Sequence, residues 1–349
     1  MTGGTSRPDR GLILAAPAEL ALEELEVGEP GPGEVRVRLL ASGVCHSDLH
    51  AIEHGFATRY PLLLGHEGAG EIEAVGDGVD EARVGERVVL GWRAPCGDCG
   101  PCRRGEPRRC ESARRAQRRI TQGGTKVNQF LVTGTFATRT VVHAGQAVAV
   151  PAELPAEQAC LIGCAVATGV GSVLNTARVW PGARVAVIGC GGVGLSVVQG
   201  ARLAGAAEIL AVDLDERKRE QARGFGATAA AESLEGDWDF VFDVVGAPAT
   251  FGAAVEALAH NGTAVLVGVP RGGAVEAGLD RLFDRRLTLT VSHGGDHLPA
   301  EDFPLYAGYA LDGRLDLAGM VTKTISLDDV PTAFEEMKRG EVIRSVVVF

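Results

Sequence analysis

The 349-residue sequence lacks an apolar run of the roughly 18 residues that a membrane-spanning helix needs. It also lacks an excess of positive charge, because 34 lysines and arginines face 45 aspartates and glutamates, for a formal net charge of -11 at pH 7. Nucleic acid binding depends on a basic surface, so this balance argues against a nucleic acid partner. The apolar residues 11–16 are followed by Pro17 and Glu19, which does not fit a signal peptide. We therefore expect a cytoplasmic protein with neither a membrane nor a nucleic acid partner.

Internal repeats and low-complexity tracts are absent from the sequence as well. Hydrophobic residues make up 46% of the chain, which is ample material for packed cores, and 349 residues are too many for one ordinary core. The 48 glycines indicate many tight turns and close backbone approaches. The composition predicts a two-domain, enzyme-like protein.

The two parts of the chain have different patterns. Residues 35–41, 69–75 and 87–90 are typical of short strands, so the first part is expected to be rich in β-structure. The second part alternates between buried strands and a helix, with strands expected at 183–189, 208–213, 239–246 and 263–269 and a helix at 191–206. This alternation predicts an α/β fold with a doubly wound parallel sheet covered by helices. It ends near residue 291, and the tail to residue 349 is expected to rejoin the first domain.

Four of the eight cysteines lie within fifteen residues, spaced C-x2-C-x2-C-x7-C: Cys96, Cys99, Cys102 and Cys110. In a reducing cytosol such thiols stay free, and four thiolates suit a tetrahedral, structural Zn²⁺ ion. An iron–sulfur cluster is the alternative. The bacterial ferredoxin spacing places the fourth cysteine three residues on and follows it with proline, whereas here seven residues intervene and Glu111 follows Cys110. The spacing therefore favours zinc.

Eight arginines crowd into the segment that overlaps and follows these cysteines. They are Arg103, Arg104, Arg108, Arg109, Arg114, Arg115, Arg118 and Arg119. Such a segment could bind an anionic ligand or another subunit, but it is more often a solvated, charged face, which is the interpretation we prefer.

A glycine-rich turn predicts a dinucleotide site. Gly189, Gly191 and Gly194 form a G-x-G-x-x-G pattern between the expected strand at 183–189 and the expected helix, with Gly192 and Val193 inside it. In this context the first glycine makes the turn, the second lets the backbone approach a pyrophosphate and the third packs helix on strand. Asp213 ends the next strand, where its carboxylate can bind the adenosine ribose hydroxyls and disfavour a 2′-phosphate. The pattern favours NAD over NADP.

Further cysteines and a histidine could supply a second metal site. Cys45 lies in the segment 43–48 and His66 in the segment 65–68. Each residue alone is ambiguous, because a single cysteine is usually a core residue and a single histidine is usually structural. Together with Cys164 they could form a Cys2His set, which is typical of catalytic zinc with one position open for substrate.

The sequence resembles the zinc-dependent medium-chain alcohol dehydrogenases over nearly its whole length. The resemblance rests, in order, on GVCHSDLH, LLGHEGAGEIEAVG, the four-cysteine loop, IGCAVATGVGSVLNTA, IGCGGVG and VIRSVVVF. Within that family, His46 together with WRAPCGDC and FATRTVVHAGQ most resembles the thiol-dependent formaldehyde dehydrogenases, especially the mycothiol-dependent branch.

The resemblance implies a domain organisation. A β-rich, GroES-like catalytic domain is expected at residues 1–164, with a structural zinc lobe at about 92–112. A Rossmann NAD-binding domain is expected at 165–291, and residues 292–349 are expected to return to the catalytic domain. The family also implies a homodimer or homotetramer, with cofactor domains pairing near the strand at 263–269 across a two-fold axis.

The resemblance also implies roles for single residues. Cys45, His66 and Cys164 would hold the catalytic zinc, with Glu67 as a nearby or transient ligand, and Ser47 and His50 would relay the proton. Thr168 and Val193 would lie beside the nicotinamide, Val269 would offer its backbone to the carboxamide, His46 and Arg344 would contact the pyrophosphate, and Lys218 would lie near the ribose. Cys160 and Cys190 match no ligand position, and we expect them to be packing residues.

The expected activity is hydride transfer between a small-molecule alcohol or aldehyde and NAD(H), with two zinc ions per subunit. Two substrate alternatives stay open: an S-hydroxymethyl adduct of a low-molecular-weight thiol, or a free alcohol, including an intermediate of secondary metabolism. Residues 113–135 and 290–304 are the loops in which specificity is expected. A non-catalytic nucleotide sensor would show a broken ligand or relay position, and none is visible. A zinc hydrolase is disfavoured by the intact NAD fingerprint.

Overall fold

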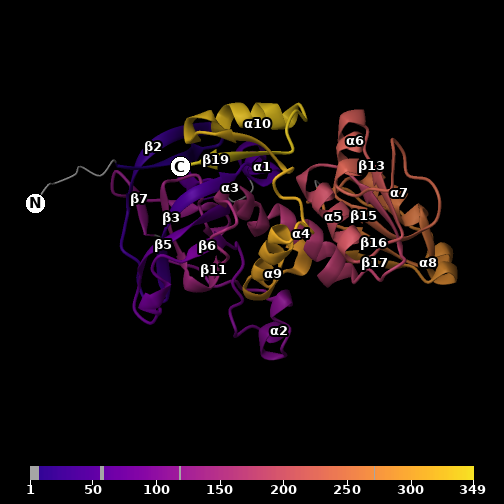
Figure 1. Cartoon of the computed structure of the whole chain (residues 1–349), viewed down its shortest axis with the longest axis horizontal. Helices are drawn as coiled ribbons and strands as arrows, with labels where there is room; N and C mark the ends of the chain where they lie inside the picture. Colours follow the sequence, from indigo (N-terminus) through magenta and orange to yellow (C-terminus); the bar gives the residue numbers. More distant parts are fainter. Residues whose placement is uncertain (1–7, 56–58, 118, 271) are drawn as a thin grey trace, which may run out of the picture. The chain divides into compact units, whose positions relative to one another are not determined.

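The computed structural model describes residues 8–55, 59–117, 119–270 and 272–349. The chain forms two compact units (Figure 1). Unit 1 comprises Met1–Cys164, Leu298–Gly313 and Leu317–Phe349, and unit 2 comprises Ala165–His297 and Arg314–Asp316. Thus the first crossing between units follows Cys164, and the chain returns at Leu298, six residues later than the sequence-based boundary at 292.

Unit 1 is built on two sheets. One has the strand order β8-β7-β2-β1-β4-β9, and the other has the order β11-β6-β5-β3-β19-β18 with β10 also pairing with β3. The strands are β1 (Asp9–Ala16), β2 (Glu19–Val27), β3 (Glu34–Gly43), β4 (Leu62–Leu63), β5 (Glu67–Val75), β6 (Arg87–Leu90), β7 (Ile120–Gln122), β8 (Thr125–Lys126), β9 (Asn128–Gln129), β10 (Arg139–His143), β11 (Ala147–Ala149), β18 (Val321–Ile325) and β19 (Arg344–Val348). The predicted strands at 35–41, 69–75 and 87–90 are confirmed as β3, β5 and β6.

Strand β3 organises the second sheet. Its alternating residues Val35, Val37 and Leu39 are buried, as expected for a strand with one face on the core. The last strand of the chain, β19, runs antiparallel to β3 and pairs Val346 with Gly43. This pairing places the C-terminal strand of the chain beside Gly43, which is followed by Val44 and Cys45.

The helices of unit 1 are mostly short. They are α1 (His46–His54), α2 (Gly100–Arg103), α3 (Ala156–Ala159), α9 (Pro299–Leu311) and α10 (Val330–Lys338). No single helix in the described ranges has the length and apolar composition to cross a membrane, although the bent pair Ala156–Gly163 and Ala165–Ala177 has both when taken together.

Unit 2 is a parallel sheet with the strand order β14-β13-β12-β15-β16-β17. Its strands are β12 (Arg184–Ile188), β13 (Glu208–Val212), β14 (Ala229–Ala231), β15 (Trp238–Asp243), β16 (Leu258–Leu266) and β17 (Thr288–Val291). Its helices are α4 (Ala165–Gly171), the π-helix Ser172–Ala177, α5 (Gly192–Leu203), α6 (Glu216–Gly224), α7 (Pro248–Glu256) and α8 (Leu279–Arg285), labelled in Figure 1 except for the π-helix. The predicted doubly wound fold is confirmed.

The chain leaves the centre of this sheet in both directions. From β12 it moves through α5 and α6 to one edge, and from β15 it moves through α7 and α8 to the other. Because parallel crossovers are right-handed, these two pairs of helices cover opposite faces of the sheet. The carboxyl ends of β12 and β15 therefore meet at the point where the winding reverses, which is where such folds bind ligands.

Candidate functional site

Four potential metal ligands converge in unit 1. One ligand atom each from Cys45, His66, Glu67 and Cys164 lies within 4.8 Å of the others. Cys45 is the N-cap of α1, His66 directly precedes β5, Glu67 begins β5, and Cys164 is the C-cap of the 3-10 turn Cys160–Gly163. The structure thus brings together the three predicted zinc ligands and the predicted nearby carboxylate.

Asp48 holds the histidine of this cluster. Its carboxylate Oδ2 lies 3.0 Å from His66 Nδ1, and its Oδ1 accepts a hydrogen bond of 2.8 Å from the backbone N–H of Gly65. Both side chains are fully buried. A carboxylate behind one ring nitrogen fixes the tautomer and directs the other nitrogen, Nε2, toward a metal.

Sequence reasoning missed Asp48, although it stands in the quoted GVCHSDLH motif. Its position one turn after Cys45 was the available signal. The ring of Phe130 was missed as well; it packs edge-on against His66, with centroids 5.5 Å apart. Nothing in the local sequence around Phe130 indicates this contact.

The charges in the cluster stabilise thiolate. The pKa of Cys45 lies well below its ordinary value, because the Cys164 thiol donates a hydrogen bond to its sulfur and the cations of Arg344 and His66 lie near. Burial alone would lower the pKa of His66, but the charges of Asp48 and Cys45 raise it well above its ordinary value. Protons and a metal ion compete for these atoms, so metal binding would release protons.

Glu67 and Arg344 form a buried pair beside the cysteine. Arg344 Nη2 lies 3.5 Å from Glu67 Oε1 and 3.8 Å from Cys45 Sγ. Burial raises the pKa of Glu67 to about 8, despite this neighbouring cation. The backbone opposite makes room for the carboxylate, because a Cβ at Gly43 would lie 2.2 Å from Glu67 Oε2.

The chemistry of this donor set fits zinc. Two sulfurs and one imidazole are the ligand types of catalytic zinc sites. His66 Nε2 and both carboxylate oxygens of Glu67 are buried without a hydrogen-bond partner in the described chain. Buried polar atoms are rarely left in this state unless they bind an ion or water. The predicted Cys2His site is therefore compatible with a metal, while its occupancy stays a prediction.

The predicted relay residues lie on the helix that starts at this cluster. Ser47 and His50 are one turn apart on α1, and Ser47 Oγ lies 3.8 Å from Cys45 Sγ. His50 is half-buried, and His46, at the first position of the helix, is exposed. This arrangement places a hydroxyl beside the metal ligands and an imidazole one turn farther from them.

The other four cysteines form a second cluster. One sulfur each from Cys96, Cys99, Cys102 and Cys110 lies within 4.8 Å of the others. Sulfurs bound to tetrahedral zinc at about 2.3 Å lie roughly 3.8 Å apart. Cys99 Sγ and Cys110 Sγ are 3.9 Å apart, which matches that geometry. With four thiolates the set leaves no position open for a substrate.

Backbone amides prepare this second cluster for an ion. Cys96 Sγ accepts N–H bonds from Asp98 and Cys99, at 3.4 and 3.2 Å, and these amides lower the pKa of Cys96. The pKa of Cys99 falls to about 6 because the amides of Cys102 and Glu111 point to it. Such N–H groups favour thiolate, which is the form that binds metal.

Several arginines of the arginine-rich segment form ion pairs with carboxylates of the same chain. Arg108 donates to Asp302 at 2.5 and 3.0 Å and to Glu301 at 3.0 Å, so it joins the cysteine lobe to α9. Arg119 pairs with the buried Glu34 at 2.9 Å, and Arg103 pairs with Asp98 on the surface. Arg118 lies outside the described residues.

The glycine-rich turn has the geometry that the sequence predicts. Gly189 has a φ of +95°, and a Cβ at Gly194 would lie 1.8 Å from Gly189 O, so both positions require glycine. A Cβ at Gly191 would meet no protein atom within 4 Å. The space at Gly191 is therefore open to a ligand at the N-terminus of α5, where amide groups and the helix dipole favour an anion. Gly192 begins this helix.

Asp213 is fixed beside this turn. Its Oδ2 accepts the N–H of Cys190 at 2.8 Å, and its Oδ1 accepts the N–H of Asp215 at 2.9 Å. These bonds hold the carboxylate at the end of β13. Lys218 lies half-buried on α6, the helix that follows.

The predicted nicotinamide residues lie in the same unit. Thr168 is on α4 and Val193 on α5, at a point where the two helices pack so closely that a Cβ at Gly169 would lie 2.6 Å from Val193 O. Val269 follows β16 and is 54% exposed, so its backbone is accessible. The predicted pyrophosphate contacts of His46 and Arg344, which belong to unit 1, stay predictions.

The two remaining cysteines are buried. Cys160 is fully buried and its thiol donates to Glu157 O at 3.4 Å, and burial raises its pKa well above the ordinary value. Cys190 is 1% exposed, and burial raises its pKa to about 12. Neutral, buried thiols behave as small hydrophobic groups, which agrees with the predicted packing role.

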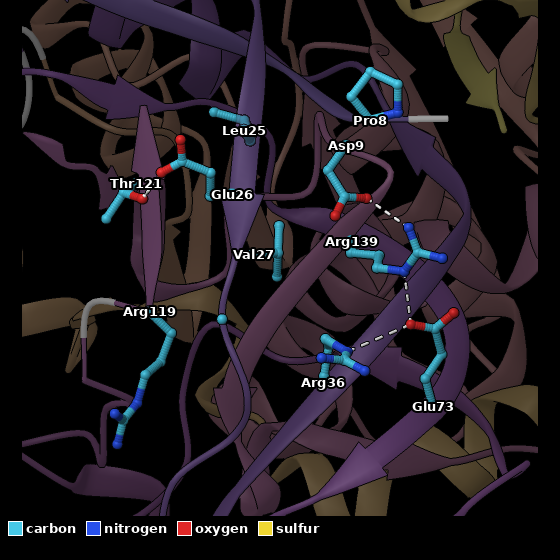
Figure 2. A pocket seen from close by; sticks show the side chains of 11 residues that line it. Pro8, Asp9, Leu25, Glu26, Val27, Arg36, Glu73, Arg119, Thr121 and Arg139 are labelled. Carbon is cyan, nitrogen blue, oxygen red and sulfur yellow. Dashed lines mark hydrogen bonds and ion pairs between the residues drawn. The ribbon is translucent and has the colours of Figure 1, made fainter. Parts of the chain in front are cut away.

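One hollow of unit 1 lies away from these residues. It has a volume of about 870 Å³, and none of its lining residues belongs to a cysteine cluster. Arg139 lies 2.6 Å from Asp9 and 2.7 Å from Glu73, and Arg36 lies 3.6 Å from the same oxygen of Glu73. Figure 2 marks these three pairs with dashed lines. The carboxylates of Asp9 and Glu73 thus compensate the guanidinium groups of Arg36 and Arg139 in this hollow.

Two family models match the chain. Residues 31–152 match the alcohol dehydrogenase GroES-like domain, and residues 192–308 match the zinc-binding dehydrogenase domain. The first match contains Cys45, His66 and the four-cysteine cluster. The second begins in the glycine-rich turn. Together the models span more than half of the chain.

Solved structures of similar proteins cover almost the whole chain. A Burkholderia ambifaria protein described as an alcohol dehydrogenase zinc-binding domain protein is 29% identical, with a TM-score of 0.92 over 98% of this chain and 99% of that one. Benzyl alcohol dehydrogenase from Acinetobacter calcoaceticus is 27% identical, with a TM-score of 0.91 over 99% and 100%. Acetophenone reductase from Geotrichum candidum, solved with NAD, is 28% identical, with a TM-score of 0.82 over 99% of each chain.

Proposed function

Because the chain belongs to the zinc-dependent medium-chain alcohol dehydrogenase family and is an oxidoreductase of that type, we propose that it interconverts an alcohol and its carbonyl product with NAD(H) as the cofactor. The convergence of Cys45, His66 and Cys164 carries this proposal, since the three ligand atoms meet within 4.8 Å although the residues are distant in sequence. The intact glycine-rich turn in unit 2 supports the choice of a dinucleotide.

The first cluster would hold the catalytic zinc. Cys45, Cys164 and His66 would be its ligands, and Asp48 would keep His66 Nε2 directed at it. A zinc ion bound in such a set lowers the pKa of an alcohol hydroxyl and polarises a carbonyl. Glu67, which pairs with Arg344, would be a nearby or transient ligand of this zinc. The second cluster would hold a structural zinc, for two ions per subunit.

Ser47 and His50 would move the proton that the alcohol loses. The Ser47 hydroxyl would accept it, and His50 would carry it toward the surface, since an imidazole can both bind and release a proton near neutral pH. Deprotonation before hydride loss is needed because a free alcohol at pH 7 is almost fully protonated. The proton would thus leave the site by way of the Ser47 and His50 side chains of α1.

The residues of unit 2 would bind and orient the cofactor. The amides of Gly191, Gly192 and Val193 would meet the pyrophosphate, and Asp213 would accept hydrogen bonds from the adenosine ribose, with Lys218 nearby. A 2′-phosphate would be repelled by Asp213, which favours NAD. Thr168 and the backbone of Val269 would orient the nicotinamide, to which the alcohol carbon gives its hydride.

The substrate is proposed to be a small alcohol or the corresponding aldehyde or ketone. The names of two similar proteins contain benzyl alcohol and acetophenone, so aromatic alcohols are the first to test. The likeness to thiol-dependent formaldehyde dehydrogenases makes an S-hydroxymethyl thiol adduct the second candidate. A dedicated intermediate of secondary metabolism is the third.

A substrate panel tests these candidates. NADH formation at 340 nm would be measured with zinc-loaded protein and ethanol, benzyl alcohol or 1-phenylethanol, and with formaldehyde in the presence and absence of mycothiol or glutathione. We expect turnover with free alcohols. Turnover only with formaldehyde and a thiol would place the protein in the thiol-dependent branch, and no NAD reduction with any of these, accompanied by ester hydrolysis, would overturn the proposal.

A further inference from the structure

Helix α1 carries three of the chain's eight histidines on one face. They are His46, His50 and His54, each four residues after the last. Residues four apart on a helix lie one above the other. The rest of the helix is partly buried, with Leu49 and Ala51 in the core and the carboxylate of Asp48 against His66. His46 and His50 have predicted roles in the reaction, whereas the exposed His54 has none.

The rings of His50 and His54 lie at a separation that suits a shared metal ion. Their centroids are 4.6 Å apart, and their planes are inclined by 67°. With metal–nitrogen bonds of about 2.1 Å, two imidazoles bound to one ion at roughly 90–110° have centroids about 4.6–5.3 Å apart. The observed separation lies at the lower end of that range. Two histidines at i and i+4 on a helix are also the pair used by helical zinc motifs.

The end of the helix adds a favourable field for a cation. His54 lies in the last turn of α1 and is exposed, and Gly55 closes the helix in the left-handed conformation with a φ of 66°. Free carbonyls at a helix C-terminus favour positive charge. The nearby cation Lys338 is compensated by Glu53 and Glu335, each at 2.9 Å.

We propose that His50 and His54 bind a divalent transition-metal ion such as Zn²⁺ or Ni²⁺, at a surface site separate from both cysteine clusters. Water would complete its coordination. The ion takes a nitrogen lone pair of His50 that a proton would otherwise occupy. It therefore inhibits turnover by removing His50 from proton transfer, a consequence that rests on the function proposed above.

Retention on a Ni²⁺-charged resin tests the site itself, because the resin-held ion cannot exchange into the cysteine clusters. Untagged, zinc-loaded protein is expected to be retained, and the His54→Gln variant is expected to elute at a clearly lower imidazole concentration. The matched control is His260→Gln, which removes an exposed histidine of unit 2 and should elute with the wild type. Elution of His54→Gln together with the wild type would overturn the site.

Inhibition of the zinc-loaded enzyme by added Zn²⁺ or Ni²⁺ tests the consequence. Without added metal, His54→Gln should turn over as fast as the wild type. The metal concentration for half-inhibition should be at least about tenfold higher in His54→Gln, because the variant loses the second of two linked ligands. Equal sensitivity would overturn the inhibitory role. If the wild type has no activity with any substrate, the proposed function fails, and the resin experiment still decides the site.

Discussion

Asp48 is the residue on which the geometry of the first cluster depends most. It is buried without exposure, yet its two oxygens serve both a backbone amide and the imidazole of His66. Without that carboxylate the imidazole could rotate or change its tautomer. The effect on the metal is indirect, because Asp48 is not itself a predicted ligand.

We expect Asp48→Asn to weaken the first zinc site while leaving the second intact. The loss of such a carboxylate behind a metal-bound histidine typically costs about 10–100-fold in metal affinity. Competition with a chromophoric chelator would measure the two affinities. Asp98→Asn, which changes an exposed carboxylate beside the other cluster, is the control. Unchanged affinity at the Cys45 site in Asp48→Asn would contradict the role of Asp48.

The lowered pKa of Glu34 predicts that the stability of the protein depends on pH. Burial raises its pKa, but the amides of Gln117 and Gly31 and the guanidinium of Arg119 outweigh this and lower the pKa below its usual range. A group whose pKa is depressed by folding stabilises the protein above its unfolded pKa. That contribution is lost as the pH falls through the folded pKa.

We therefore expect Glu34→Gln to reduce the free energy of unfolding at pH 7 by about 1–3 kcal/mol, because it weakens several hydrogen bonds to a buried group. The difference from the wild type should shrink at an acidic pH below the lowered pKa of Glu34, where Glu34 itself takes up a proton. Urea unfolding at both pH values would measure it, with the exposed Glu81→Gln as the control. A difference that grows on acidification would contradict this account.

At the scale of elements, the turn between β12 and α5 contains two glycines that are expected to serve different purposes. Gly194 is needed by the protein, because a methyl group there would collide with Gly189 O at 1.8 Å. Gly191 has open space around it and an ordinary φ of -77°. Alanine would fit the fold at Gly191 and would occupy only the space proposed for the cofactor.

This difference gives a matched pair of variants. We expect Gly194→Ala to lower the melting temperature and to weaken NADH binding, whereas Gly191→Ala should keep the melting temperature and weaken NADH binding alone. Differential scanning fluorimetry and a fluorescence titration with NADH would measure the two effects. Wild-type affinity in Gly191→Ala would show that the pyrophosphate does not lie against this turn.

Elements defined by local spacing were predictable from the sequence. The four-cysteine lobe and the strand, turn and helix at 183–206 depend on neighbours within about twenty residues, and both formed as expected. Contacts over long separations were not predictable from local spacing, because they depend on the order of strands in a sheet, and the Cys45, His66 and Cys164 set was expected only from the ligand types and the family resemblance. Arg344 lies 299 positions from Cys45 and reaches it only because β19 pairs with β3.

At the scale of the whole molecule, the sheet of unit 2 suggests where two copies would meet. The sequence-based prediction places the pairing near residues 263–269, which include the end of β16, the strand next to β17 in the sheet. The two edge strands are β14 and β17. Strand β17 exposes Leu289 and Val291, and α8 exposes Leu279 and Phe283 at 82% and 84%. An unpaired edge and adjacent apolar side chains are suited to pairing with a second copy.

We propose a homodimer or homotetramer that uses this edge, and we expect Phe283→Glu to shift it toward the monomer. A buried charge at an apolar interface is costly because it loses hydration. Light scattering after size exclusion would measure the mass. Leu305→Glu, a similar change at an exposed leucine of α9, should leave the mass unchanged. A Phe283→Glu variant with the wild-type mass would rule out this edge.

The two cysteine clusters have different proposed roles, structural for the second and catalytic for the first. The second cluster would hold its lobe together, and structural zinc contributes about 10–16 kcal/mol in small peptides, comparable with the stability of a domain. Cys99→Ser is therefore expected to lose soluble protein. The first cluster is positioned by the pairing of β3 with β5, which joins Gly43 to Glu67, so Cys45→Ser is expected to keep the fold.

Zinc content and NADH formation, measured together on wild-type, Cys45→Ser and Cys99→Ser protein, test this central claim most directly. The account predicts two zinc ions per chain in the wild type. In Cys45→Ser it predicts one zinc ion, an unchanged melting temperature and no turnover, while Cys99→Ser yields little soluble protein. Equal zinc content, solubility and turnover in all three proteins would contradict it.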